Sequence, residues 1–195
     1  MIKKVLFINP PVIEESTLNT QPVPLGVISI AEYLRQRDHN CKVVNLCDCK
    51  CWSEVQDKLR FELNVDYVGI PCFTRQRFSV VKLAELVKKM NPRVQLWLGG
   101  PHATFLDVDI LKKYKYVDFI IRGEGEETAA CLISNSSMLY QIDGITFRDN
   151  YGKVIRNKDR EKLQQLEKFP VPLQSVDELE ELNQSESLLF HFPNF

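Results

Sequence analysis

Short apolar runs, each followed by a stretch whose apolar residues have helical spacing, recur through the first two thirds of the chain. The runs lie at 4–9, 43–46, 66–70, 94–98 and 118–121. The helical patterns that alternate with them cover 25–34, 52–63, 79–90, 107–113 and a segment from about 126 through Cys131. A strand that is apolar on both faces is typical of a parallel sheet with helices on either side. The alternation therefore predicts a doubly wound, flavodoxin-like α/β fold with a five-stranded parallel sheet.

The pattern changes after residue 135. Two short β-type runs flank Asp149-Asn150-Tyr151-Gly152 within 142–155, which predicts a small β-hairpin. Further on, 177–186 contains five acidic side chains and no lysine or arginine. We divide the chain into an α/β domain at 1–135, a hairpin connector at 136–156, and a linker with an acidic tail at 157–195, which we expect to be flexible.

Charge and hydropathy exclude several classes of function. The chain has 25 Lys and Arg residues against 26 Asp and Glu. It therefore lacks the excess of basic residues that is typical of proteins that bind nucleic acid. No apolar run approaches the roughly 20 residues that a membrane-spanning helix needs. The apolar run near the N-terminus is too short for a signal peptide. We therefore expect a cytoplasmic protein without a membrane span.

Six cysteines, four of them between 41 and 51, raise the question of a metal site. Structural zinc sites use two well-separated pairs of the form C-x2-4-C. The run Cys47-Asp48-Cys49-Lys50-Cys51 is tighter than this, and no matching pair follows it. We therefore predict reduced thiols and no metal ligands.

Ligands of open parallel sheets bind outside the carboxyl ends of the strands. The loops to consider begin at Asn9, Pro71, Gly99 and Arg122, and the first of them, which reaches Pro24, is unusually long. Neither G-x-G-x-x-G after the first strand nor G-x-x-x-x-G-K-[ST] occurs, which argues against a dinucleotide site and a P-loop. No catalytic set of side chains is complete in these loops.

Several polar side chains in the loops have two interpretations. His102 is either a hydrogen-bonded residue of its turn or a ligand contact. Glu124 and Glu126 are either paired carboxylates or acids at the start of a helix, where the helix dipole favours them. Thr74 either binds a ligand or caps the next segment. Cys72 is either buried or facing the cleft.

Four motifs, in order along the chain, carry a resemblance to a known family. They are Asn9-Pro10-Pro11, Pro24-Leu25-Gly26, Leu98-Gly99-Gly100-Pro101-His102-Ala103-Thr104 and Arg122-Gly123-Glu124-Gly125-Glu126. Together they resemble the N-terminal cobalamin-binding domain of B12-dependent radical S-adenosylmethionine enzymes, which include the anaerobic magnesium-protoporphyrin cyclase and several C-methyltransferases. The resemblance covers 1–135, and the hairpin resembles the small connector of these enzymes.

The resemblance implies a cobalamin at the carboxyl edge of the sheet, with its corrin over the loops and its dimethylbenzimidazole tail in a slot of the domain. Gly99 and Gly100 would let the tail pass close to the backbone. The cofactor contacts that the resemblance implies are Asn9, Pro10, Pro11, Leu25, Gly26, Cys72, Phe73, Thr74, Gly99, Gly100, Pro101, His102, Ala103, Gly123, Glu124 and Gly125.

Two positions depart from the family's pattern. No histidine lies between Asn9 and Leu34, so the resemblance implies no histidine ligand to cobalt from that loop. Pro71 stands where the family usually carries a hydroxyl, and Cys72 or Thr74 would have to supply that hydrogen bond.

The cysteine spacing separates this chain from the radical half of the family. That half needs C-x3-C-x2-C for its [4Fe–4S] cluster, and no three cysteines here have this spacing. We expect a cobalamin-binding module that is not catalytic alone, with the cluster and S-adenosylmethionine in a missing or separate domain, or in a partner protein. Two alternatives stay open, a degenerate or truncated scaffold without a cofactor and a flavodoxin-like binder of flavin mononucleotide or another nucleotide.

Overall fold

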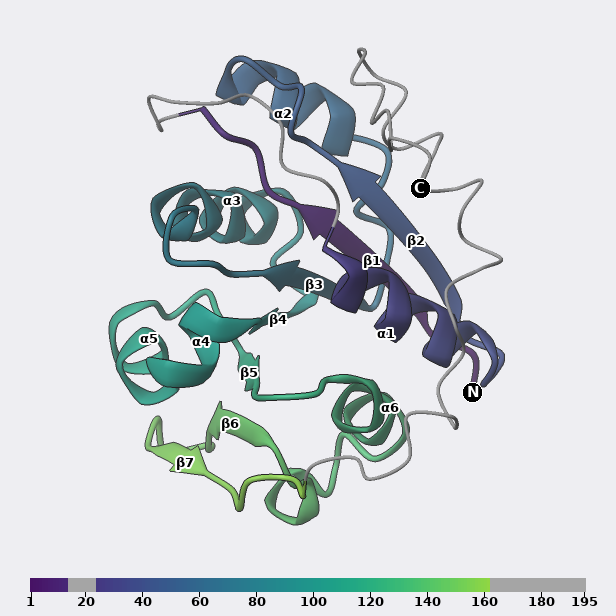
Figure 1. The fold of residues 1–195 in the computed structure, drawn as a ribbon, viewed down its shortest axis with the longest axis vertical. Helices are drawn as coiled ribbons and strands as arrows, with labels where there is room; N and C mark the ends of the chain where they lie inside the picture. Colours follow the sequence, from purple (N-terminus) through teal and green to yellow (C-terminus); the bar gives the residue numbers. More distant parts are fainter. Residues whose placement is uncertain (14–23, 162–195) are drawn as a thin grey trace, which may run out of the picture.

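A computed structural model describes residues 1–13 and 24–161, and its elements follow the predicted alternation (Figure 1). The strands are β1 (Lys4–Asn9), β2 (Asn40–Asn45), β3 (Tyr67–Pro71), β4 (Gln95–Gly99), β5 (Phe119–Ile121), β6 (Ile145–Arg148) and β7 (Val154–Arg156). The helices are α1 (Leu25–Arg35), α2 (Trp52–Leu59), α3 (Arg77–Met90), α4 (Pro101–Phe105), α5 (Asp107–Lys113) and α6 (Glu126–Ser134), with a 3-10 turn η1 (Leu139–Gln141). None of the described helices is long and apolar enough to cross a membrane.

The strands form one sheet in the order β2-β1-β3-β4-β5-β6-β7. The first five are parallel, which confirms the doubly wound, flavodoxin-like prediction. The chain passes outward from β1 to β2 and then back across β1 to β3. The carboxyl ends of β1 and β3 therefore flank the switch point of strand order, where such sheets bind ligands.

Alternation along the strands divides the apolar residues into two cores. In β1, Val5 and Phe7 face one core, whereas Leu6 and Ile8 face the other. The first core lies under α1 and α6, and the second under α2, α3, α4 and α5. Figure 1 shows α1 and α6 on the side of the sheet opposite α3, α4 and α5. Every buried strand thus has helices on both faces, as the apolar runs predict.

The predicted hairpin forms and extends the sheet beyond the five parallel strands. β6 pairs antiparallel with β5, and β7 pairs antiparallel with β6. The Asp149 carboxylate accepts hydrogen bonds from the backbone N–H groups of Tyr151 and Lys153 in the turn. Ile145 and Phe147 are buried in the core that α1 and α6 cover, so pairing with β5 both covers an open sheet edge and extends that core.

A buried charged cluster holds this hairpin and the segment after it. Arg122 is only 3% exposed. It donates hydrogen bonds from Nε and Nη2 to the Asp159 carboxylate and from Nη1 to Thr146 Oγ1. Thr146 Oγ1 donates to Asp107 Oδ2 at 2.6 Å, and Arg156 Nε donates to the same oxygen at 3.0 Å. The end of β5 is thereby tied to α5, β6, β7 and residue 159.

Some boundaries differ from the prediction. β2 begins at Asn40 rather than at 43, because Asn40 and Cys41 continue the parallel register opposite Lys4 and Val5. The short helix α4 was not predicted; it begins at Pro101, whose fixed φ suits the first turn of a helix. The long loop at 14–23 and the expected flexible tail at 162–195 lie outside the described residues.

Candidate functional site

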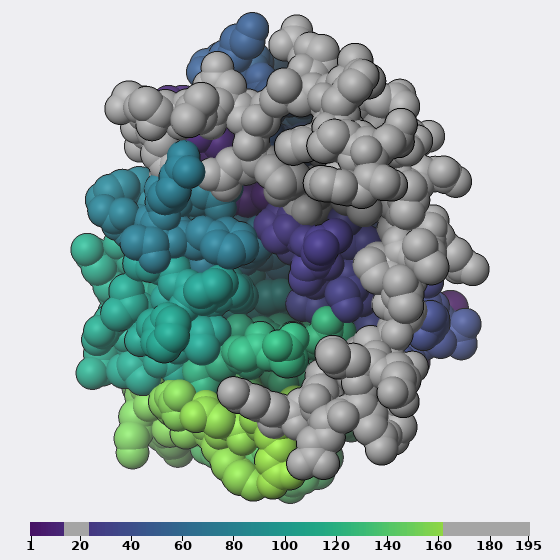
Figure 2. Space-filling view, viewed as in Figure 1, coloured from purple at the N-terminus to yellow at the C-terminus, as the bar shows by residue number. Residues whose placement is uncertain are grey.

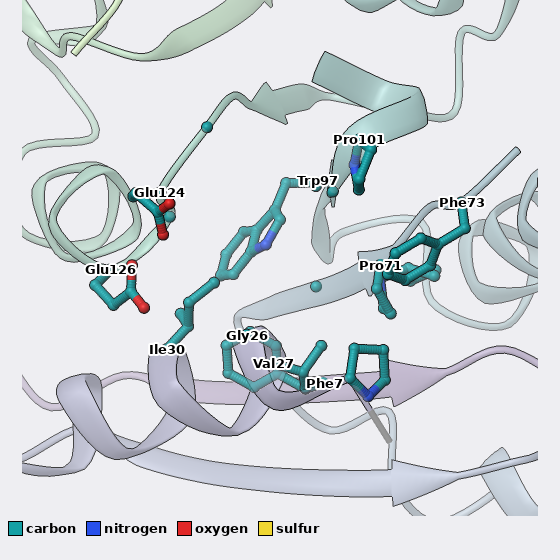
Figure 3. A pocket seen from close by; sticks show the side chains of 17 residues that line it. Phe7, Gly26, Val27, Ile30, Pro71, Phe73, Trp97, Pro101, Glu124 and Glu126 are labelled. Carbon is teal, nitrogen blue, oxygen red and sulfur yellow. The ribbon is translucent and has the colours of Figure 1, made fainter. Parts of the chain in front are cut away.

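A cavity of about 320 Å³ opens at the carboxyl edge of the sheet, next to the switch point. The close-up shows β1, β3 and β4 on its walls with α1 and the start of α6 (Figure 3). In the space-filling view the surface is hollowed between α1 and the teal part of the chain that carries β4 and α4 (Figure 2). The residues that line the cavity are Phe7, Pro24, Gly26, Val27, Ile30, Gly69, Ile70, Pro71, Phe73, Trp97, Gly99, Gly100, Pro101, Gly123, Glu124, Gly125 and Glu126.

Aromatic side chains form the inner wall of this cavity. Trp97 and Phe7 meet edge to face, with ring centroids 5.9 Å apart. Gly69, on the strand between theirs, leaves the space for both rings, because a Cβ there would lie 2.7 Å from Trp97 Nε1. Trp97 projects into the cavity with its indole nitrogen turned toward the interior (Figure 3). The wall is therefore aromatic and apolar, and it carries one N–H donor.

Glycines bring the backbone close to the cavity at its rim. Gly100 has φ +87°, and a Cβ on it would lie 3.2 Å from the carbonyl oxygen of Cys72. A Cβ on Gly125 would lie 2.6 Å from Ile30 Cδ1 across the gap between α6 and α1. Side chains at these two positions would strain the loop or fill the cavity, so the glycines keep it open.

Two carboxylates lie on the α6 side of the cavity (Figure 3). Glu124 is exposed, whereas Glu126 is only 7% exposed. Ser29 Oγ donates to Glu126 Oε1 at 2.6 Å, which joins α1 to α6. Glu126 Oε2 is buried and has no hydrogen-bond partner among the described residues. Glu126 thus begins a helix and also presents an unpaired acceptor at the cavity.

The structure brings half of the predicted contacts together around this cavity. These are Gly26, Phe73, Gly99, Gly100, Pro101, Gly123, Glu124 and Gly125. Asn9 is instead fully buried, and its Nδ2 donates to Asn45 Oδ1 and Cys47 Sγ in β2 and the loop that follows. Pro10 and Pro11 are buried outside the lining, while Leu25 is exposed at the first turn of α1.

The remaining predicted contacts face the other side of the sheet. Cys72 and His102 line a second cavity of about 300 Å³ between α3 and α5, and Ala103 is buried in the core on that face. His102 Nδ1 and Thr74 Oγ1 are hydrogen-bonded at 3.2 Å. Partial burial lowers the pKa of His102, and the charge of Arg77 lowers it further. Burial raises the pKa of the Cys72 thiol to about 12. His102 therefore fits a neutral, hydrogen-bonded loop residue, and Cys72 a buried, protonated thiol.

Several lining residues were not assigned from the sequence as contacts. They are Phe7, Pro24, Val27, Ile30, Gly69, Ile70, Pro71, Trp97 and Glu126. Strand alternation was the available signal for Phe7 and Trp97, since both point to the face that α1 covers. In 1–13 and 24–161, no three His, Cys, Asp or Glu side chains are grouped so as to hold a metal ion.

Comparison with known proteins gives consistent matches. A family model described as the B12 binding domain matches residues 16–133. An uncharacterized methyltransferase of Pyrococcus horikoshii is 28% identical over 88% of this chain and 38% of its own length. The anaerobic magnesium-protoporphyrin IX monomethyl ester cyclase of Synechocystis is 30% identical over 89% of this chain and 36% of its own length. The chain thus spans between a third and two fifths of the length of these two relatives.

Solved structures agree on the fold. The cobalamin-dependent S-adenosylmethionine radical enzyme OxsB, with aqua-cobalamin and S-adenosylmethionine bound, superposes with a TM-score of 0.75. The match covers 93% of this chain and 25% of the OxsB chain at 20% sequence identity. At that identity the superposition establishes a shared fold.

Proposed function

The chain belongs to the B12-binding domain family, and we propose from this premise that the cavity between α1 and α6 holds the nucleotide tail of a cobalamin. The family match confirms the resemblance drawn from the sequence. The position at the switch point of strand order is where a sheet of this topology binds its ligand. The corrin then lies outside, over the loops at the carboxyl edge of the sheet.

The shape and chemistry of the cavity are the observations that carry this proposal. The lower base of cobalamin is flat, aromatic and apolar at its methylated edge. Trp97 and Phe7 offer it an apolar aromatic wall, with the two rings edge to face. Gly69, Gly100 and Gly125 keep the cavity open at places where a Cβ would meet a neighbouring atom at 3.2 Å or less. The residues present fit the tail, which is far slimmer than the corrin.

The role of this chain is to bind and orient the cofactor. Bound cobalamin supplies a cobalt centre capable of carrying a methyl group. Trp97, Phe7 and Val27 exclude water from the base, and the glycine rim lets the tail enter. Among the described residues, those that line the cavity include no histidine.

The radical chemistry of the family belongs, in this proposal, to a separate domain or partner protein in the cytoplasm. Exposed aromatic side chains at the carboxyl edge support such a contact, because Phe105 is 84% exposed and Phe78 is 59% exposed. All six cysteines are free thiols, which suits a reducing compartment. Methyl transfer or cyclization is then the activity of the assembled enzyme.

The test is an anaerobic titration of the chain with hydroxocobalamin, followed by visible absorption and equilibrium dialysis. We expect saturable binding and a base-off spectrum. Absence of saturable binding at tens of micromolar ligand would contradict the proposal and leave a scaffold that has lost its cofactor. A parallel titration with flavin mononucleotide separates the flavodoxin-like alternative, because flavin binding gives a yellow complex.

A further inference from the structure

One carboxylate oxygen in the lining of the cavity between α1 and α6 lacks a hydrogen-bond partner among the described residues. Glu126 Oε1 is bonded to Ser29 Oγ at 2.6 Å, whereas Oε2 is buried and accepts no hydrogen bond within the described residues. The side chain is 7% exposed and lies beside the cavity (Figure 3). A buried acceptor that is left unpaired destabilises the fold, and more so where it is charged. A ligand that brings a hydrogen-bond donor to this oxygen would therefore be favoured in the cavity.

The position of Glu126 at the start of α6 explains why an acidic residue is favoured there, but it does not explain why Oε2 has no hydrogen-bond partner among the described residues. As the first residue of α6, it is stabilised by the positive end of the helix dipole. Glu127, in the same turn, instead meets Arg160 Nη1 at 2.8 Å on the outside of the helix. Glu124 is exposed and can be hydrated. Glu126 alone among these three acids is both buried and incompletely bonded.

A second polar group faces the same space. The indole nitrogen of Trp97 is turned into the cavity (Figure 3), and its N–H has no acceptor among the described residues. Besides the exposed carboxylate of Glu124, the cavity thus presents one buried acceptor and one donor in a mostly apolar lining. A few placed polar groups in an apolar pocket are the usual source of ligand specificity.

The chemistry of the nucleotide tail complements this pair. In the base-off form the benzimidazole has no N–H, but it has a free ring nitrogen that accepts a hydrogen bond. The ribose attached to it carries hydroxyl groups, which donate. We propose that Glu126 Oε2 accepts a hydrogen bond from the ribose hydroxyls of the tail and that Trp97 Nε1 donates to the free ring nitrogen. The two residues determine specificity for cobamides with a complete nucleotide tail.

This inference rests on the proposed function and is tested with two ligands. Hydroxocobalamin carries the tail, and aquacobinamide has the same corrin without the nucleotide. Equilibrium dialysis with absorbance detection gives the dissociation constant of each ligand for the whole chain. We expect Glu126→Ala to weaken hydroxocobalamin binding by about tenfold to a hundredfold, as for a lost hydrogen bond to a charged group. Its affinity for aquacobinamide should stay within about twofold of the wild type.

Control variants separate this role from folding and from net charge. Glu127→Ala removes the same charge from the same turn and should leave both affinities unchanged. Glu126→Gln keeps a neutral oxygen acceptor and should give an intermediate loss, since neutral hydrogen bonds are about half as strong. Circular dichroism and thermal unfolding establish that each variant is folded. Trp97→Phe provides an independent variant, which should also weaken hydroxocobalamin selectively.

The outcomes distinguish this inference from the proposed function. Unchanged hydroxocobalamin binding in folded Glu126→Ala, with wild-type binding intact, would overturn the inference alone. Equal losses for hydroxocobalamin and aquacobinamide would also overturn it, because Glu126 would then act on the corrin or on the fold. If the wild-type chain binds neither ligand, the proposed function itself fails.

Discussion

Gly69 lies directly against the indole of Trp97. A Cβ on Gly69 would stand 2.7 Å from Trp97 Nε1 and 2.9 Å from two ring carbons of Phe7. At Gly69 the strand β3 therefore has no side chain on the face where its two neighbours, β1 and β4, carry the rings of Phe7 and Trp97. The aromatic wall of the cavity can form because residue 69 has no side chain.

Gly69→Ala should push both rings from their positions. Overpacking of a filled core typically lowers the free energy of unfolding by about 1 to 3 kcal/mol. We expect a loss in that range by urea denaturation, together with weaker hydroxocobalamin binding because Trp97 moves into the cavity. Gly99→Ala serves as the control for stability, since the nearest atom to a Cβ there, Ile121 O, is 3.6 Å away. Equal stability of the two variants would show that Trp97 adjusts freely.

Gly100→Leu should abolish cobalamin binding while the fold survives. Gly100 has φ +87° and ψ 176°, a region that is essentially restricted to glycine, and forcing another residue into it costs about 1 to 3 kcal/mol. A Cβ on this lining residue would also lie 3.2 Å from the carbonyl oxygen of Cys72 and would displace the loop at the edge of the cavity. Circular dichroism should keep the α/β signature, and dialysis should show no saturable hydroxocobalamin binding. Retained affinity would place the tail elsewhere.

The fold and the place of the cavity were predictable, because apolar runs and helical spacing determine a doubly wound sheet and the edge at which its loops gather. The walls of the cavity were not. Gly69 and Trp97 are 28 residues apart, and only the register that pairs Gly69 with Trp97 places them together. Glu126 had two interpretations, and it both begins α6 and lines the cavity.

Two further features, the hairpin and the direction of the Cys72 side chain, depend on how the strands pair, which no local sequence pattern determines. The hairpin at 145–156 was recognisable, but its contact with β5 depends on an open sheet edge that no local pattern reveals. Cys72 follows a strand end next to the site, as a contact would. The alternation of the strand turns its side chain into the opposite core, away from the α1–α6 cavity.

Arg122→Met should destabilise the chain strongly. The guanidinium is 3% exposed and is bonded to Thr146, Asp159 and the carbonyl oxygen of Asn157. Removing one member of a buried ionic cluster costs about 3 to 5 kcal/mol, because the remaining charges lose their partner. Asp159→Asn is the comparison, since that carboxylate is 65% exposed and should cost less than about 1 kcal/mol. Urea denaturation measures both, and similar small losses would show that Arg122 is dispensable.

Cys72 should make the stability of the chain fall in alkaline solution. Burial raises the pKa of its thiol from 9.0 to about 12, so above pH 9 the unfolded chain loses this proton before the folded chain does. Stability from this group is complete below pH 9 and is lost as the pH rises toward 12. The loss amounts to roughly 1 kcal/mol by pH 10.

Cys72→Ala isolates this contribution. At pH 7 the wild type is more stable than the variant, because the variant has lost the packing of the sulfur atom. Since only the wild type carries the thiol, its advantage in unfolding free energy should shrink by roughly 1 kcal/mol at pH 10. The buried tyrosines titrate equally in both chains and cancel from the comparison. Urea denaturation at pH 7, 8, 9 and 10 provides the measurement. A difference that stays constant across this range would mean that water reaches the thiol and that Cys72 ionises as it does in the unfolded chain.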